Sequence, residues 1–179
     1  MKKSLFASAF VVLTGLLSVS SVLADEPLVT FRGGIGAIPI SNVVVDTTTG
    51  AVTVTRNIVR GVNSPGQIWR IGDLDATIKT NGDISVTGNG LVLGGGNNIG
   101  RATGQSVFAT LICEAAAPFT EHSTTLTGIQ LAPNGDFKID DVLDPLPPTD
   151  CASPMLLIRT SNNNAANRNW FAAGIPVLK

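Results

Sequence analysis

The chain has 179 residues, of which 44% are hydrophobic, 14% are charged and 5% are aromatic, and its formal net charge is −1. Its twelve lysines and arginines are scattered along the sequence, whereas proteins that bind nucleic acid or anionic membranes displace counterions with clustered basic residues. The composition therefore argues against nucleic acid as a partner.

The first 24 residues have the three parts of a cleavable signal peptide. Lys2 and Lys3 form the positive start, residues 5–17 the apolar middle, and residues 22–24 (Val-Leu-Ala) the small-residue pattern before Asp25. The apolar stretch is shorter than the roughly 20 residues that span a bilayer, so we expect cleavage and no transmembrane anchor. We expect export to the periplasm, the cell surface or the medium.

Cleavage would leave residues 25–179, which is 155 residues with ten basic and thirteen acidic side chains and a formal charge of −3. That length suits a single domain with one hydrophobic core. Short runs rich in Val, Ile, Thr and Phe recur between Gly, Asn, Asp and Pro, which is typical of an all-β domain.

The first strands are expected at residues 28–32, 42–46 and 51–56, the last two paired around the Thr-Thr-Thr-Gly segment at 47–50. In the third run, Val52, Val54 and Arg56 alternate with smaller or more polar residues. Alternating side chains point to opposite faces of a strand, so one face of this pair should be more apolar than the other.

The clearest turn signal is Asn81-Gly82, between strands expected at 76–79 and 84–87, because this dipeptide accepts the positive φ angles of a tight hairpin. A second Asn-Gly pair at 89–90 leads into residues 91–93, so this part should form a meander. Residues 94–100 are too glycine-rich for a strand interior and are expected to form a mobile loop.

Five further strands are expected, at residues 106–113, 124–131, 137–142, 155–159 and 170–173, with an Asn-rich loop at 161–169. About nine strands joined by turns predict an antiparallel two-sheet β-sandwich, with a closed β-barrel as the alternative.

Cys113 and Cys151 are the only cysteines, and in an exported chain they predict one disulfide. It would join the strand at 106–113 to the start of the strand at 155–159. Two separate buried thiols are the alternative. A metal site is less favoured, because two cysteines and the lone His122 do not complete a tetrahedral ligand set.

Catalytic motifs are scarce. His122 is the only histidine and hence the sole candidate base for a hydrolase triad, and no serine lies in a recognisable nucleophile motif. We expect His122 to be an exposed residue near the start of a strand. Neither glycine cluster, at 33–36 or 94–96, precedes a helix as a phosphate loop does, so flexible or tightly turning backbone is expected there. No cofactor is expected.

Two groups of carboxylates are candidates for a cation site or for glycoside hydrolysis. Asp73 and Asp75 should share one face of a strand, and Asp140, Asp141 and Asp144 form a denser group. Neither group has the spacing of a calcium loop, so solvated or turn-capping roles are favoured. If a cation binds, the group from Asp140 to Asp144 is the first choice.

Trp69 and Trp170 are the two tryptophans and are expected to be core or half-buried anchors. Together with Arg70, Asp73 and Asp75 they are our candidates for a binding surface. The loops at 94–104 and 161–169 are the candidate contact surfaces for a partner.

Five segments of the sequence resemble a group of uncharacterised exported bacterial all-β proteins. The resemblance implies a common fold over most of the chain after residue 24 and no activity or catalytic residue. The segments that carry it are residues 58–62, Trp69, Asn81-Gly82, residues 107–113 and residues 151–154.

These features favour a secreted or surface-associated structural or binding module, with an extracellular protein or a surface as its partner. The alternative is a small extracellular hydrolase or cation-dependent enzyme that uses His122 or the group from Asp140 to Asp144. An enzyme is the less favoured of the two because a recognisable catalytic motif is missing.

Overall fold

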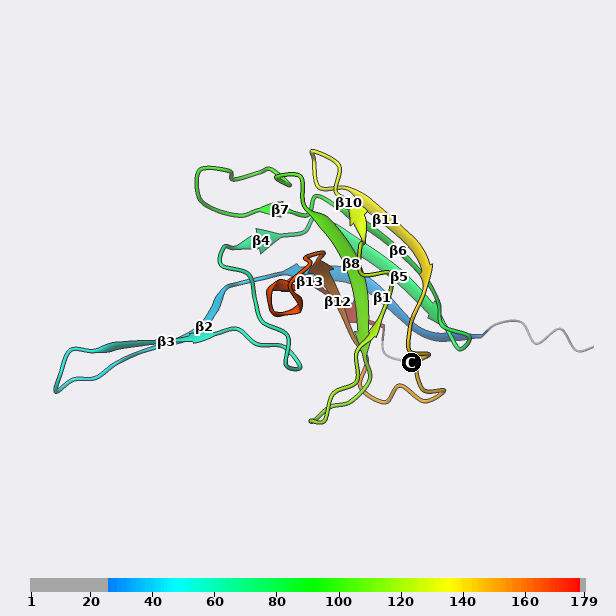
Figure 1. Ribbon diagram of the computed structural model, residues 1–179, viewed down its shortest axis with the longest axis horizontal. Coiled ribbons are helices and arrows are strands. Elements are labelled where there is room, and N and C mark those ends of the chain that lie inside the picture. The colour runs from blue at the N-terminus through cyan, green and yellow to red at the C-terminus, as the bar shows by residue number, and fades with distance from the viewer. Residues whose placement is uncertain (1–25, 178–179) are drawn as a thin grey trace, which may run out of the picture.

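Thirteen β-strands and one short 3₁₀ turn make up the regular structure of residues 26–177, the part of the chain that the computed structural model describes (Figure 1). The predicted signal peptide, residues 1–24, lies outside this part. The strands are β1 (Pro27–Gly36), β2 (Ile40–Val45), β3 (Val52–Arg56), β4 (Trp69–Arg70), β5 (Asp73–Lys79), β6 (Asp83–Asn89), β7 (Val92–Leu93), β8 (Ser106–Ile112), β9 (His122–Ser123), β10 (Ile129–Gln130), β11 (Phe137–Val142), β12 (Met155–Thr160) and β13 (Trp170–Pro176); the 3₁₀ turn η1 is Ala165–Asn167.

Nine of these strands form one antiparallel sheet in the order β10-β8-β12-β13-β1-β5-β6-β11, with β9 paired to β8. The sheet curls until its end strands β10 and β11 contact each other, and a backbone bridge between Ser123 and Asp144 joins the same two sides. The antiparallel all-β prediction is confirmed. The sheet has a nearly closed, barrel-like form, which is closer to the predicted alternative than to two separate layers.

The core follows from alternation along the strands. Leu74, Ala76 and Ile78 of β5 are buried, whereas Asp73, Asp75 and Thr77 between them are exposed. The Asn81-Gly82 turn joins β5 to β6 as predicted, and Gly82 adopts a φ of 88°, which a residue with a Cβ adopts only with strain. The neighbouring strands β8 and β12 are buried on both faces along most of their length.

The predicted disulfide is confirmed. Cys113 directly follows β8, Cys151 lies four residues before β12, and their Cα atoms are 4.7 Å apart. Because β8 and β12 pair along six residues, the disulfide fastens two neighbouring strands of the main sheet.

The strand predicted at 124–131 is wrong over most of its length. In this segment only Ile129–Gln130 is a strand. The Thr124 hydroxyl accepts the amide hydrogen of Ala109 at 3.0 Å, and a turn closes between Thr125 and Gly128, whose φ is 62°. The Thr124 N–H still donates to the Ala109 carbonyl at 2.9 Å, but the Ala109 N–H goes to the Thr124 side chain, so regular strand pairing ends at this residue.

The glycine cluster at 33–36 lies inside β1 and is not a loop. The register of β1 against β13 shifts between Phe31 and Gly34, as at a β-bulge. A Cβ on Gly36 would collide with the backbone of Trp69. Glycine is therefore needed here for close packing against β4 as well as for flexibility.

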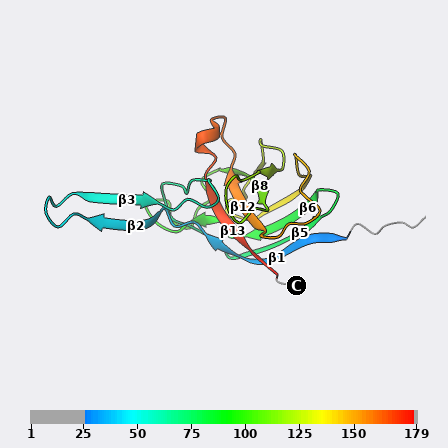
Figure 2. The ribbon, with the colours of Figure 1, turned by 90° about the horizontal axis from the view of Figure 1, so that it is seen from below.

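Strands β2 and β3 form a separate two-stranded sheet that projects from the body of the molecule (Figures 1 and 2). We refer to residues 40–56 as the arm. Among residues 26–177 no helix is both long and apolar enough to cross a membrane.

Candidate functional site

The arm exposes every residue of both of its strands. Its register places Val43 opposite Val54 and Val45 opposite Val52. Directly opposed residues of an antiparallel pair have their side chains on the same face. One face of the arm therefore consists of these four valines, which we call the valine face, and each of them is between 51% and 61% exposed.

The opposite face of the arm is more polar. It carries Asn42 opposite Thr55 and Val44 opposite Thr53. The predicted pairing around residues 47–50 and the predicted difference between the two faces of this strand pair are therefore confirmed. What the sequence analysis did not predict is that the more apolar face would remain uncovered.

The turn at the tip of the arm is held by one aspartate. The Asp46 side chain accepts the backbone N–H groups of Thr48 at 2.8 Å and Thr49 at 3.0 Å. These hydrogen bonds lower the pKa of Asp46, because they stabilise the charged carboxylate. Asp46 at the tip and Arg56 at the end of β3 are the two ionisable side chains of the arm, so the strands of the arm offer little to a strongly charged partner.

The base of the arm is attached to the body by hydrogen bonds that the sequence analysis did not anticipate. Asn57 donates its backbone N–H to the Pro39 carbonyl and its side-chain amide to the Ile38 carbonyl, both at 3.0 Å. The buried Trp170 donates its indole N–H to the Asn57 carbonyl, and the Ser64 hydroxyl donates to the Pro39 carbonyl. These contacts set the direction in which the arm leaves the body.

Exposed large apolar side chains concentrate at the arm and its base. Sixteen are exposed among the described residues, and ten of them lie between residues 35 and 68. Large exposed apolar patches mark interaction sites in soluble proteins, so the arm is the first place to look for one. The ten are Ile35, Ile38, Ile40, Val43, Val44, Val45, Val52, Val54, Ile58 and Ile68.

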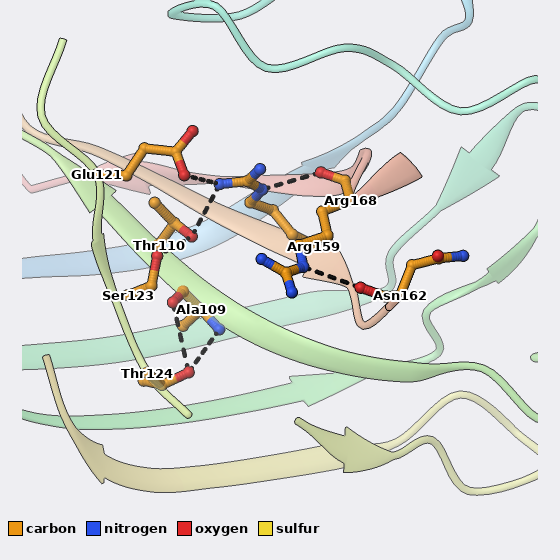
Figure 3. Close-up of polar contacts among 8 residues, drawn as sticks. All are labelled: Ala109, Thr110, Glu121, Ser123, Thr124, Arg159, Asn162 and Arg168. Carbon is orange, nitrogen blue, oxygen red and sulfur yellow. Dashed lines mark hydrogen bonds and ion pairs between the residues drawn. The ribbon is translucent and has the colours of Figure 1, made fainter. Parts of the chain in front are cut away.

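A second region is a polar pocket of about 450 Å³ beside β9 and β12, built around Arg159 (Figure 3). Arg159 is only 6% exposed. Its Nη1 donates to Glu121 Oε2 at 2.6 Å and to Thr110 Oγ1 at 3.4 Å, and its Nε donates to the Arg168 carbonyl at 3.0 Å. The guanidinium also lies 5.3 Å from the ring centroid of Phe108, within the range of a cation–π contact.

The neighbours of Arg159 are also fixed by hydrogen bonds. Thr110 and Ser123 share a hydrogen bond of 2.9 Å between their hydroxyls, and Arg168 donates its Nε to the Asn162 carbonyl at 2.9 Å (Figure 3). Glu121 compensates the charge of Arg159. The pocket is therefore a polar network that ties β8, β9, β12 and the loop after β12 together.

His122 is buried, with 4% of the residue exposed, so the expectation of an exposed histidine is wrong. Successive residues of a strand point to opposite sides, and Glu121 and Ser123 line the Arg159 pocket whereas His122 does not. Its Nδ1 lies 2.8 Å from the Pro145 carbonyl oxygen, and its buried Nε2 has no hydrogen-bond partner within residues 26–177. His122 thus points away from the residues that line the Arg159 pocket.

The aspartates from Asp140 to Asp144 have separate local roles. Asp140 pairs with Lys138 at 2.7 Å and accepts the Ser85 hydroxyl at 2.6 Å, and these two neighbours lower the pKa of Asp140. Burial by itself raises the pKa of Asp141, but the N–H groups of Thr125 and Val142 outweigh it and the net pKa is lowered. No group of three or more potential metal-ligating side chains converges in the described residues.

The candidate binding residues divide between core and surface. Trp69 and Trp170 are 5% and 3% exposed, as expected for anchors, and Trp69 stacks on Phe171 with ring centroids 4.0 Å apart. Arg70, Asp73 and Asp75 are exposed, with both aspartates on the outer face of β5.

The two loops predicted as contact surfaces do meet. Residues from 94–104 and from 161–169 line one shallow hollow of about 440 Å³, with Trp69 and Phe171 among its other lining residues. Its loop residues are uncharged: Asn98, Thr103, Asn162, Asn167 and Asn169. The loop after β7 is also tied down, because Gly100 donates its N–H to the Leu93 carbonyl and Leu93 donates its own to the Arg101 carbonyl.

We compared the chain with protein-family models, with curated proteins and with solved structures, and none of the three comparisons finds a match. Three features of the structure bear on function: the arm, the Arg159 pocket and the hollow between the two loops.

Proposed function

We propose that this protein is an exported structural module that binds another protein through its arm. The observation that carries the proposal is the valine face, in which four side chains on one face of the ribbon are all more than half exposed. A two-stranded hairpin with an apolar face is at best marginally stable alone in water. Contact with a partner would remove that face from solvent.

Other features of the arm support the same function. Its two strands have no third strand beside them in the described part of the chain, and unpaired strand edges readily accept another chain. The hydrogen bonds of Asn57 and Trp170 hold the base of the arm in place. A ribbon whose direction is already set loses less conformational entropy when it binds.

The test compares two glutamate variants that differ only in the face they alter. Val54→Glu puts a charge on the valine face, and Thr53→Glu puts the same charge on the opposite face one residue away. The wild-type protein, Val54→Glu and Thr53→Glu are each immobilised and exposed to the native extracellular and periplasmic fractions, and the retained proteins are quantified by mass spectrometry.

We expect the wild-type protein and Thr53→Glu to retain the same partner, and Val54→Glu to retain at least about tenfold less, because a charge in an apolar contact is costly to bury. Circular dichroism checks that both variants are folded. Equal retention by all three proteins would show that the valine face is not the binding surface.

A further inference from the structure

We infer that the partner of the arm is a second copy of this chain, and that two arms pack valine face against valine face across a two-fold axis. This inference rests on the proposed function and names the partner. Its first support is the register of the arm, which opposes valine to valine twice, at Val43 and Val54 and at Val45 and Val52.

That register makes the valine face self-complementary. The two strands contribute the same side chains in the same pairs, so a half-turn about an axis that lies in the plane of the face places the valines of a second arm against these valines. A two-fold interface requires the same patch on both subunits to fit itself. A face of four β-branched residues of one size meets that requirement without a complementary pocket elsewhere on the molecule.

The charge distribution of the arm also favours a second copy of the chain as the partner. Asp46, at the tip, is the one ionisable residue between Ile40 and Arg56, and its carboxylate already accepts two backbone N–H groups of its own turn. Two arms that approach each other therefore meet little like-charge repulsion along the strands. A strongly charged partner, by contrast, would find Arg56 at the end of β3 as the one exposed charged side chain on the strands of the arm.

The size of the surface is adequate for a dimer. A standard protein–protein interface has roughly 20–30 residues on each side. The segment from Ile38 to Ile58 comprises 21 residues, and it holds eight of the exposed large apolar side chains of the described residues: Ile38, Ile40, Val43, Val44, Val45, Val52, Val54 and Ile58. Val44 lies on the opposite face of the arm, and only the side chains on the valine face would enter the contact, so the contact is smaller than the standard size and suits a weak dimer.

The arm lies at one end of the molecule, whereas β1 begins at the opposite end (Figures 1 and 2). Two copies joined through their arms would therefore hold their barrel-like bodies apart on either side of the ribbon contact. The Arg159 pocket is built from β8, β9, β12 and the loop after β12 and does not include the arm. It would stay accessible in such a dimer.

The first test is the oligomeric state of the purified exported protein by sedimentation velocity, from about 1 to about 500 µM, a range that spans the affinities common for interfaces of this size. We expect a monomer–dimer equilibrium for the wild-type protein and for Thr53→Glu. For Val54→Glu we expect the association constant for dimerisation to be at least tenfold smaller. Each factor of ten corresponds to about 1.4 kcal/mol.

The second test determines which face of the arm contacts the second copy. The chain has two cysteines, and they are joined in the disulfide, so one introduced cysteine supplies a single thiol. Under mild oxidation, Val54→Cys should form covalent dimers much faster than Thr53→Cys, because only the first position faces the other copy. Peptide mapping confirms that the Cys113–Cys151 pairing is retained.

Three results would overturn the inference: a wild-type protein that stays monomeric over the whole range, a Val54→Glu variant that dimerises as well as Thr53→Glu, or equal cross-linking at positions 53 and 54. If the wild-type protein is monomeric but a different protein is retained by it and lost with Val54→Glu, the proposed function stands and the second-copy inference fails. If Val54→Glu changes neither retention nor dimerisation, both fail.

Discussion

Arg159 shows how a single residue links distant parts of this fold. Its side chain is 7% exposed, while that of its ion-pair partner Glu121 is 48% exposed. The guanidinium has therefore lost most of its water and depends on Glu121, Thr110 and the Arg168 carbonyl for compensation. Breaking such an arrangement is costly because a buried charge is left with fewer partners.

From this geometry we predict that Glu121→Gln lowers the free energy of unfolding by about 1 kcal/mol, since a neutral hydrogen bond replaces a charge-assisted one. Denaturant titration followed by tryptophan fluorescence measures the change. The matched control is Lys138→Gln, which removes the exposed ion pair with Asp140 and should leave stability unchanged. A Glu121→Gln variant as stable as the control would mean that Arg159 does not depend on this carboxylate.

His122 is a second residue that differs from the expectation, because it was expected to be exposed and is buried. In the sequence, His122 follows Glu121 and precedes three polar residues, which suggests a position exposed to solvent. In the fold it lies in β9, and β9 is covered because it pairs with β8 on one side while Ser123 bridges to Asp144 on the other. Burial at this position depends on contacts with Leu111, 11 positions away, and Pro145, 23 positions away, and the sequence next to His122 does not reveal these contacts.

At the scale of elements, the arm and the body are predicted to be energetically separate. All residues of β2 and β3 are exposed, and the hydrogen bonds of the base involve Ile38, Pro39 and Asn57, which lie outside the two strands. The arm therefore contributes little to the core. Its apolar residues are better explained by binding than by folding.

This separation predicts the outcome of removing the arm. Ile40 and Arg56 are directly paired, so residues 41–55 can be replaced by a two-residue Asn-Gly turn. We expect the unfolding free energy of the monomer to change by less than about 1 kcal/mol, as for surface changes away from packed features. The measurement is denaturant titration at low concentration, where dimerisation does not contribute. Loss of a cooperative transition would show that the arm is part of the folding unit.

Elements also differ in how well local pattern predicts them. The hairpin of β5 and β6 has alternating burial and an Asn-Gly turn, and both its strands were predicted within three residues of their observed ends. Residues 124–131 have similar β-forming composition, but the contact of the Thr124 hydroxyl with Ala109 and the turn at Gly128 divert the chain. The difference arises from a contact with a residue 15 positions away.

For the whole molecule, the Cys113–Cys151 disulfide is the covalent constraint on the fold, and it spans 38 residues of sequence. In the chain-entropy description, closing a loop of this length destabilises the unfolded state by about 4 kcal/mol. The disulfide also joins segments next to β8 and β12, which lie side by side in the main sheet, so the constraint acts where the core is most deeply buried.

We therefore predict that the double variant Cys113→Ala/Cys151→Ala loses about 4 kcal/mol of unfolding free energy relative to the oxidised protein. Chemical denaturation of both proteins gives the difference. A reducing agent should lower the stability of the wild-type protein by a similar amount and leave the variant unaffected. If the variant and the oxidised wild-type protein were equally stable, the disulfide would have no part in maintaining the fold.

The sequence by itself was sufficient for the antiparallel all-β class, most strands, the Asn81-Gly82 turn, the disulfide pairing and the unequal faces of the arm. These features depend on short-range properties: the two-residue period of a strand, the φ preference of glycine, and the presence of just two cysteines. Each can be recognised within a few residues or by counting.

Tertiary structure decided the rest. The curling of one sheet into a nearly closed, barrel-like form, the burial of His122, the partners of Arg159 and the meeting of the loops at 94–104 and 161–169 all depend on contacts between segments far apart in sequence. The arm makes the distinction clearest. Alternation predicted an apolar face at Val52 and Val54, but whether that face is covered depends on where the rest of the chain lies, and here the body leaves it exposed.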